Sequence, residues 1–117
     1  MSSPLKDSGN RTSLSGNMLR DIQEGRERFD LLLPELQDYE DTWIYKLAKH
    51  YSNGAMKYSD RNWEQACGED NYNSFRQSAM RHFFQLLAGD ESEDHQSAVM
   101  FNLIGMDYVK WRMRNNK

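Results

Sequence analysis

Apolar residues recur at three- and four-residue steps in three stretches of the chain, and polar segments separate the stretches. The first begins at Pro34 and ends near residue 52, where an Asn-Gly pair favours a helix stop. The second runs from about Asp70 to just before Gly89, and the third from about Ser92 to near residue 117. The period is that of amphipathic helices. The pattern therefore predicts an all-α fold, a compact bundle of about three main helices with short links.

The N-terminal part of the chain has a different composition. Residues 1–17 are rich in Ser, Asn and Gly and have almost no apolar periodicity, so we expect an extended, flexible arm there. No alternating pattern predicts a strand. With 117 residues the chain is long enough for one modest core. We therefore expect residues 18–117 to form a single helical domain that binds the ligand.

Charge and composition limit the partners. The net charge of −3 gives no overall attraction to nucleic acid or to an anionic membrane, so any phosphate binding must be local. A single cysteine, Cys67, rules out an internal disulfide framework and fits a reducing compartment. No apolar run reaches the roughly 20 residues of a membrane span. We expect a cytoplasmic protein with no nucleic-acid or membrane partner.

The third predicted helix carries apolar side chains on two flanks. One flank holds Ala98, Val99, Met106, Val109 and Met113, and the other holds Phe101, Ile104, Tyr108 and Trp111. Three helices of this size enclose a thin core, and monomers rarely leave large apolar faces in water. We therefore expect a homodimer or a higher homo-oligomer.

The segment after the first predicted helix gathers cations, amides and aromatic rings. Lys57 and Arg61 could neutralise phosphate oxygens, and the planar guanidinium could do so with two parallel hydrogen bonds. Tyr58 or Trp63 offers a flat face for a base, and Asn62 could contact a base edge or orient water. The alternative is a helix-capping turn whose aromatic rings fill the core and whose cations are solvated.

Three polar residues interrupt the apolar stripes of the second and third predicted helices. They are His82, His95 and Asn102. Burial without a partner would cost each of them about 1–3 kcal/mol. If they are buried, their polar atoms must therefore bond to one another, to water, to a metal or to a ligand. The simplest structural interpretation is a hydrogen-bonded pair between the two helices.

Four carboxylates precede and surround His95, at positions 90, 91, 93 and 94. Acidic residues at a helix N-terminus often only complement the helix dipole. Together with the histidine, however, they could bind Mg²⁺ or Mn²⁺, which take oxygen ligands near phosphates. Both interpretations stay open, and Glu93 and Asp94 are the candidate metal ligands.

Several short motifs occur in an order that resembles a known family. They are Asp7-Ser-Gly9-Asn-Arg11, Arg20-Asp21-Ile-Gln-Glu24-Gly25, Arg28-Phe29-Asp30, Asn53-Gly54-Ala-x-Lys57-Tyr58-x-Asp60-Arg61-Asn62-Trp63-Glu64, Ser78-Ala-x-Arg81-His82, Glu93-Asp94-His95 and Asn102. The order looks like the phage-encoded dATP/dGTP diphosphohydrolase family. The resemblance extends from about residue 6 to residue 105.

The resemblance implies a small phage nucleotide-handling protein of the infected cytoplasm, distantly similar to the MazG-like pyrophosphohydrolases. Water would attack the α-phosphorus of dATP or dGTP and release pyrophosphate. Glu93 and Asp94 would hold Mg²⁺ or Mn²⁺, and His82 or His95 would orient the water or take its proton. The remaining predicted contacts are the triphosphate clamp Lys57, Arg61 and Arg81, and the pocket residues Arg20, Arg28 and Asp30 from the N-terminal segment.

Two other function classes fit the same residues. Glu27 places a carboxylate where the family pattern has glycine, and the paired Glu-x-x-Glu motifs of MazG-like enzymes are missing. A non-catalytic protein could use the same clamp to sequester a cyclic or ADP-ribose-derived immune signal, as an anti-defence function, without a metal. A helical adaptor that binds another protein through its Met- and Trp-bearing face is the third possibility.

Overall fold

The computed structural model describes residues 11–13, 16, 19–21 and 25–117. The chain divides into two compact units, Met1–Leu32 and Leu33–Lys117. The predicted N-terminal arm and the motif from Asp7 to Asn10 lie largely or wholly outside the described residues. The predicted domain boundary after residue 17 stays a prediction.

The first unit contains a short β-hairpin that the sequence pattern did not predict. Strand β1 (Arg11–Ser13) pairs antiparallel with β2 (Leu19–Asp21), and Thr12 lies opposite Arg20. Three residues are too few for an alternating pattern to stand out from the polar sequence around them. A 3-10 helix, η2 (Phe29–Leu32), follows.

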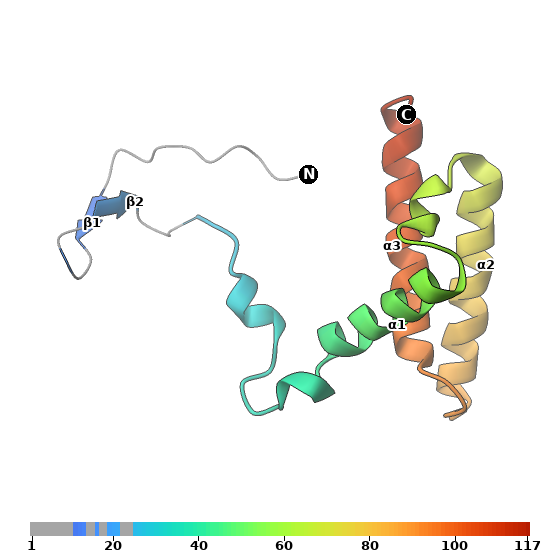
Figure 1. The fold of residues 1–117 in the computed structure, drawn as a ribbon, viewed down its shortest axis with the longest axis horizontal. Helices are drawn as coiled ribbons and strands as arrows, with labels where there is room; N and C mark the ends of the chain where they lie inside the picture. The colour runs from blue at the N-terminus through green and yellow to red at the C-terminus, as the bar shows by residue number, and fades with distance from the viewer. Residues whose placement is uncertain (1–10, 14–15, 17–18, 22–24) are drawn as a thin grey trace. The chain divides into compact units, whose positions relative to one another are not determined.

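The second unit is helical, and the predicted all-α class of the body is confirmed. Its three main helices are α1 (Trp43–Lys57), α2 (Gly68–Leu87) and α3 (His95–Arg114). Helices α2 and α3 pack along each other, and α1 crosses them with its main contacts on α3 (Figure 1). Two 3-10 helices, η3 (Tyr39–Asp41) and η4 (Asn62–Gln65), flank α1. No helix in the described residues is long and apolar enough to cross a membrane.

Helix α1 begins later and ends later than the sequence pattern indicated. Its N-cap is the buried Thr42, whose hydroxyl oxygen accepts a hydrogen bond from the backbone N–H of Tyr45. The hydroxyl oxygen of a threonine at the N-cap can accept from a backbone N–H of the first helical turn, whereas a proline side chain has no acceptor. Helix α1 therefore begins after Thr42. The predicted stop at residues 53 and 54 lies inside the helix, which continues until the Tyr58 N–H bonds to the Gly54 carbonyl.

Small residues bring α2 and α3 close together. Ala79, Ala98 and Val109 are the buried apolar residues of the described chain. At Gly105 a β-carbon would lie 2.6 Å from the ring of Phe75, so the aromatic ring rests directly on the α3 backbone. The α2–α3 contact is therefore a narrow seam with little room for larger side chains.

The predicted second flank of α3 is partly covered. Phe101 and Tyr108 are half-buried, because their rings contact Tyr51 and Trp63 edge-on, whereas Ile104 and Trp111 are exposed. A further exposed apolar stripe lies on α2. It consists of Met80, Phe83, Phe84 and Leu87, with between 43% and 66% of each residue exposed.

Candidate functional site

A pocket of about 950 Å³ lies where the end of α1, the connector of residues 58–66, the first half of α2 and the middle of α3 meet. Five of the predicted nucleotide-binding residues line it: Tyr58, Arg61, Asn62, Trp63 and Asn102. Lys57 and Arg81 are exposed and are not part of the lining. The pocket therefore gathers the predicted aromatic and amide groups and one of the three cations of the predicted triphosphate clamp.

The cation of the pocket is Arg61, which has an unusual backbone. Its φ of 58° places it in the left-handed region, immediately before η4. The guanidinium donates a hydrogen bond to Glu64 over 2.7 Å, and this bond is the main reason that the pKa of Arg61 is raised. The side chain is 79% exposed. A permanently charged group thus stands at the rim of the pocket and has one carboxylate partner.

The two aromatic rings of the connector have different environments. Trp63 is half-buried and makes edge contacts with Tyr51 and Tyr108, with ring centroids 5.8 and 5.1 Å apart. Tyr58 is 64% exposed, and the ammonium group of Lys57 lies 5.2 Å from its ring centroid. Tyr58 therefore offers the accessible face, whereas Trp63 anchors the connector.

The connector is held by a residue that sequence reasoning missed. One terminal nitrogen of Arg112 donates to the carbonyl oxygens of Glu64, Gln65 and Ala66 at 3.3, 3.3 and 2.9 Å. The Tyr108 hydroxyl also donates to the Glu64 carbonyl, at 3.1 Å. No local sequence motif marks this role, because Arg112 and Ala66 are 46 positions apart in the chain.

The floor of the pocket includes polar groups from all three helices. Asn102 is 7% exposed, and its amide donates to the Ala98 carbonyl over 2.7 Å. His50 of α1 also lines the pocket, with its ring centroid 5.2 Å from that of Phe101. Sequence reasoning missed His50, although it is a polar residue next to Tyr51 in an apolar stripe, the same signal that identified the other two histidines.

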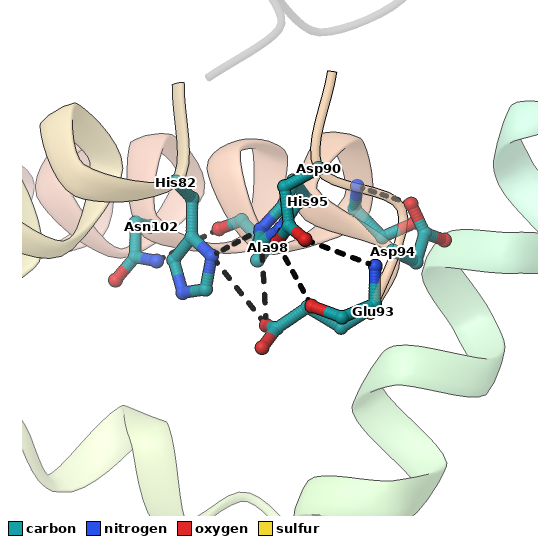
Figure 2. Close-up of polar contacts among 9 residues, drawn as sticks. His82, Asp90, Glu93, Asp94, His95, Ala98 and Asn102 are labelled. Carbon is teal, nitrogen blue, oxygen red and sulfur yellow. Dashed lines mark hydrogen bonds and ion pairs between the residues drawn. The ribbon is translucent and has the colours of Figure 1, made fainter. Parts of the chain in front are cut away.

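The histidines of α2 and α3 meet directly. His82 and His95 approach through their Nδ1 atoms, which are 2.9 Å apart (Figure 2). The predicted hydrogen-bonded pair between the two helices is thereby confirmed. His95 is the first residue of α3 and is 1% exposed. Burial is the main reason that the pKa of His82 is lowered, which favours the neutral form of its imidazole.

Two carboxylates complete this cluster. The Nε2–H group of His95 donates to Asp90 Oδ2 over 2.5 Å. That hydrogen bond, followed by one from the Ser92 hydroxyl, lowers the pKa of Asp90. Glu93 Oε1 lies 3.5 Å from His82 Nδ1 and 3.9 Å from His95 Nδ1. We call His82, Glu93 and His95 the histidine–glutamate cluster.

Asp94 does not join Glu93 in this cluster. Its two carboxylate oxygens accept hydrogen bonds from the backbone N–H and the hydroxyl of Ser97, at 3.0 and 2.6 Å, so Asp94 is the N-cap of α3. In Figure 2 its carboxylate is directed away from that of Glu93. Partial burial raises its pKa, but the hydrogen bonds from Ser97 and the nearby cations outweigh this and leave the pKa lowered. The two adjacent acids therefore lie in different environments.

The other predicted pocket residues belong to the first unit. Arg20 lies in β2, and Arg28 pairs with Asp30 through hydrogen bonds of 2.8 and 2.6 Å. Both members of the pair are exposed. Their contribution to the pocket stays a prediction.

The pocket and the histidine–glutamate cluster share the α2–α3 seam. Ser78 lines the pocket and precedes His82 by one helical turn, which corresponds to about 6 Å along α2. Asn102 follows His95 by two turns, or about 10 Å along α3. A ligand seated in the pocket could therefore extend along the seam toward the cluster.

Comparison with known proteins identifies a family. No curated protein and no solved structure is similar enough to match. The family described as dATP/dGTP diphosphohydrolase, N-terminal, matches residues 17–115, nearly the whole chain. Together with the motifs that gather at the pocket and the cluster, this match shows that the chain belongs to the dATP/dGTP diphosphohydrolase N-terminal family.

Proposed function

We propose that the chain binds a purine deoxynucleoside triphosphate, dATP or dGTP, and hydrolyses it to the monophosphate and pyrophosphate. The observation that carries the proposal is the pocket, which combines a cation, an exposed aromatic face and two amides in a family named for this reaction. Its volume of about 950 Å³ falls within the range of small-molecule sites, about 300–1,000 Å³.

The chemistry of the lining suggests how the nucleotide would lie. The base would stack on Tyr58, and Asn62 or Asn102 would contact its edge. Arg61 would bind phosphate oxygens. Its guanidinium would either keep its hydrogen bond to Glu64 at the same time or exchange that bond for one to the phosphate. The triphosphate would then extend along the seam toward His82.

The reaction needs a positioned water and a proton acceptor. Water attacks the α-phosphorus, the bond from that phosphorus to the bridging oxygen breaks, and pyrophosphate leaves. As long as no ion occupies the cluster, His82 can take the proton of the water, because burial lowers its pKa and so favours the neutral imidazole. A divalent ion, Mg²⁺ or Mn²⁺, would offset phosphate charge in this reaction.

One observation favours sequestration as the second candidate function. Asp60 is the only carboxylate among the described residues that line the pocket. Mg²⁺-dependent enzymes hold the metal through carboxylates beside the phosphates, whereas a protein that only binds a nucleotide needs none. A phage protein that retains an immune-signal nucleotide would use the same pocket without turnover.

Incubation with dATP or dGTP, with Mg²⁺, Mn²⁺ or EDTA, followed by heat denaturation and chromatography, tests both functions. Monophosphate and pyrophosphate that appear only with metal support hydrolysis. Intact nucleotide released by heating supports sequestration. The same incubation with a panel of cyclic nucleotides tests whether the chain binds an immune signal instead. A folded protein that binds none of these compounds contradicts both proposals.

A variant pair locates the binding site. Arg61→Asn removes the cation and keeps a residue that tolerates the left-handed backbone. We expect it to lose at least about tenfold in nucleotide affinity, as removal of a charged hydrogen bond of about 1.5–3 kcal/mol implies. Lys110→Gln, an exposed α3 cation outside the lining, is the matched control. Equal affinities for the two variants would exclude Arg61 from the site.

A further inference from the structure

Three potential metal ligands converge at one end of the α2–α3 seam. The ligand atoms of His82, Glu93 and His95 all lie within 4.8 Å of one another. They come from two different places in the fold, α2 and the turn that leads into α3. The side chain of His95 is 1% exposed and that of His82 14%, whereas that of Glu93 is 56% exposed. The cluster is thus fixed on its inner side and accessible through its carboxylate.

Asp90 prepares His95 for a ligand role. A carboxylate only accepts hydrogen bonds, so the proton of the His95 ring lies on Nε2 and the lone pair lies on Nδ1. Nδ1 is the atom that faces His82 and Glu93. Asp90 is itself held by the Ser92 hydroxyl over 2.8 Å. A histidine that ligates a metal usually donates its other N–H to such a carboxylate.

The position of the Glu93 carboxylate suits a small ion better than it suits a hydrogen bond. The two nitrogens can share one proton, but Glu93 Oε1, at 3.5 and 3.9 Å, is beyond good hydrogen-bond distance of either. Ligand atoms around an ion with bonds of about 2.0–2.2 Å lie roughly 3.0–3.5 Å apart. The nitrogens are 2.9 Å apart, and a small rotation of the exposed Glu93 side chain would bring its oxygen into range.

We propose that His82 Nδ1, His95 Nδ1 and the Glu93 carboxylate bind a divalent transition-metal ion such as Zn²⁺, Co²⁺ or Mn²⁺, in preference to Mg²⁺. Two imidazole nitrogens suit these ions, whereas Mg²⁺ prefers an all-oxygen shell. The set differs from the Glu93 and Asp94 pair expected from sequence, since Asp94 caps α3. The site rests on the cluster geometry and not on the proposed nucleotide chemistry. With the ion bound, both histidines act as ligands, and the proton acceptor must be another group.

Metal binding can be measured without any nucleotide. The full chain is freed of metal with EDTA, dialysed, and titrated with Zn²⁺, Co²⁺, Mn²⁺ and Mg²⁺ by calorimetry. Binding of Co²⁺ is also followed by its visible absorption spectrum. We expect about one Zn²⁺ or Co²⁺ per chain, weaker Mn²⁺ binding and no Mg²⁺ binding at matched concentrations. The titration is repeated with Cys67→Ser, because this exposed thiol could bind Zn²⁺ elsewhere.

Variants assign the ligands. Glu93→Gln alters an exposed side chain, and Glu91→Gln, an exposed acid in the same turn outside the cluster, is the matched control. We expect Glu93→Gln and Asp90→Asn each to weaken Co²⁺ binding by about 10- to 100-fold, and Glu91→Gln to leave it unchanged. His82→Gln should abolish the Co²⁺ spectrum, with folding checked by circular dichroism. The proposal is overturned if the folded wild-type chain binds neither Zn²⁺ nor Co²⁺, or if it binds Mg²⁺ as tightly as these ions. It is also overturned if Glu93→Gln and Glu91→Gln have the same affinity for Co²⁺.

Discussion

Glu93 and Asp94 are neighbours in the chain, but their carboxylates have different partners. Asp94 accepts hydrogen bonds from the first turn of α3, and Glu93 faces two imidazole rings. A side chain at the N-cap position reaches back to its own helix backbone, and the preceding side chain is free of that constraint. One residue of offset thus separates a structural acid from a candidate metal ligand.

The N-cap bond of Asp94 predicts a pH-dependent contribution to stability. The folded-state pKa of Asp94 is lowered, so its contribution is complete above the unfolded value of about 3.9 and is lost as the pH falls through the folded value. Asp94→Ala should reduce the free energy of unfolding at pH 7 by about 1 kcal/mol. Urea denaturation at neutral and acid pH measures both effects.

Asp94→Asn is the matched control, because Asn caps helices as well as Asp and does not titrate. This variant should have the same free energy of unfolding as the wild type at pH 7. Below the lowered pKa of Asp94 it should be more stable than the wild type, because the wild type loses its cap there. An Asn variant as unstable as the Ala variant at pH 7 would contradict the capping role.

At the scale of elements, the pocket depends on a connector that has little structure of its own. Residues 58–66 contain only the short helix η4, and their carbonyl oxygens are bound by Arg112 and Tyr108 of α3. Without these donors three adjacent carbonyls would lose their partners within the protein. Arg112 and Tyr108 of α3 therefore hold the connector that carries Arg61 and Tyr58, although neither of them lines the pocket.

Loss of the Arg112 side chain should loosen the connector. In Arg112→Gln we expect faster hydrogen exchange across residues 58–66 and at least about tenfold weaker nucleotide binding, because several charged hydrogen bonds disappear. Arg114→Gln, an exposed cation in the same last turn, serves as the control. Unchanged exchange in the Arg112 variant would show that other contacts hold the connector.

The seam between α2 and α3 predicts a second element-level effect. In Gly105→Ala the new methyl group would overlap the Phe75 ring, and we expect a loss of about 1–3 kcal/mol in the free energy of unfolding. Adding Phe75→Leu in the same chain should recover part of this loss, because the smaller side chain leaves room. Chemical denaturation of the four proteins of this cycle measures the coupling. A purely additive result would mean that the two residues do not contact each other.

At the scale of the whole molecule, the body has few buried apolar residues and a long exposed apolar stripe. Met80, Phe83, Phe84 and Leu87 recur at helical spacing on α2 and are all exposed. A second stripe on a helix that already packs through its other face is typical of an interface. The expected homo-oligomer thus has a candidate surface on α2, in addition to Ile104 and Trp111, the exposed part of the α3 flank that the sequence suggested.

Sedimentation at several protein concentrations tests this surface. We expect a species larger than the monomer for the full chain and a shift toward the monomer in Phe84→Ser with Leu87→Ser. Met56→Ser, which changes an even more exposed apolar residue of α1, should leave the distribution unchanged. A wild-type chain that sediments as a monomer at all concentrations would rule out the oligomer.

Periodicity was sufficient to predict three helices, because α2 and α3 carry regular apolar stripes. It misplaces the ends of α1, because the Thr42 cap sets the start and the helix continues through the Asn-Gly pair to Lys57. Residue types identified five of the residues that line the pocket and the two histidines of the cluster. The roles of Arg112 and His50 depend on contacts between elements far apart in the chain, and that of Asp90 depends on the path of the turn before α3, and a one-dimensional pattern does not contain them.

The close α2–α3 seam has a consequence for ligand size. Because Phe75 rests on the Gly105 backbone, these two helices cannot separate to admit a bulkier compound without breaking their own contact. Any widening must occur on the side of the connector, where Tyr58 and Arg61 are exposed. Analogues enlarged at the end that faces the connector should therefore be tolerated, while those whose bulk requires α2 and α3 to separate should be rejected.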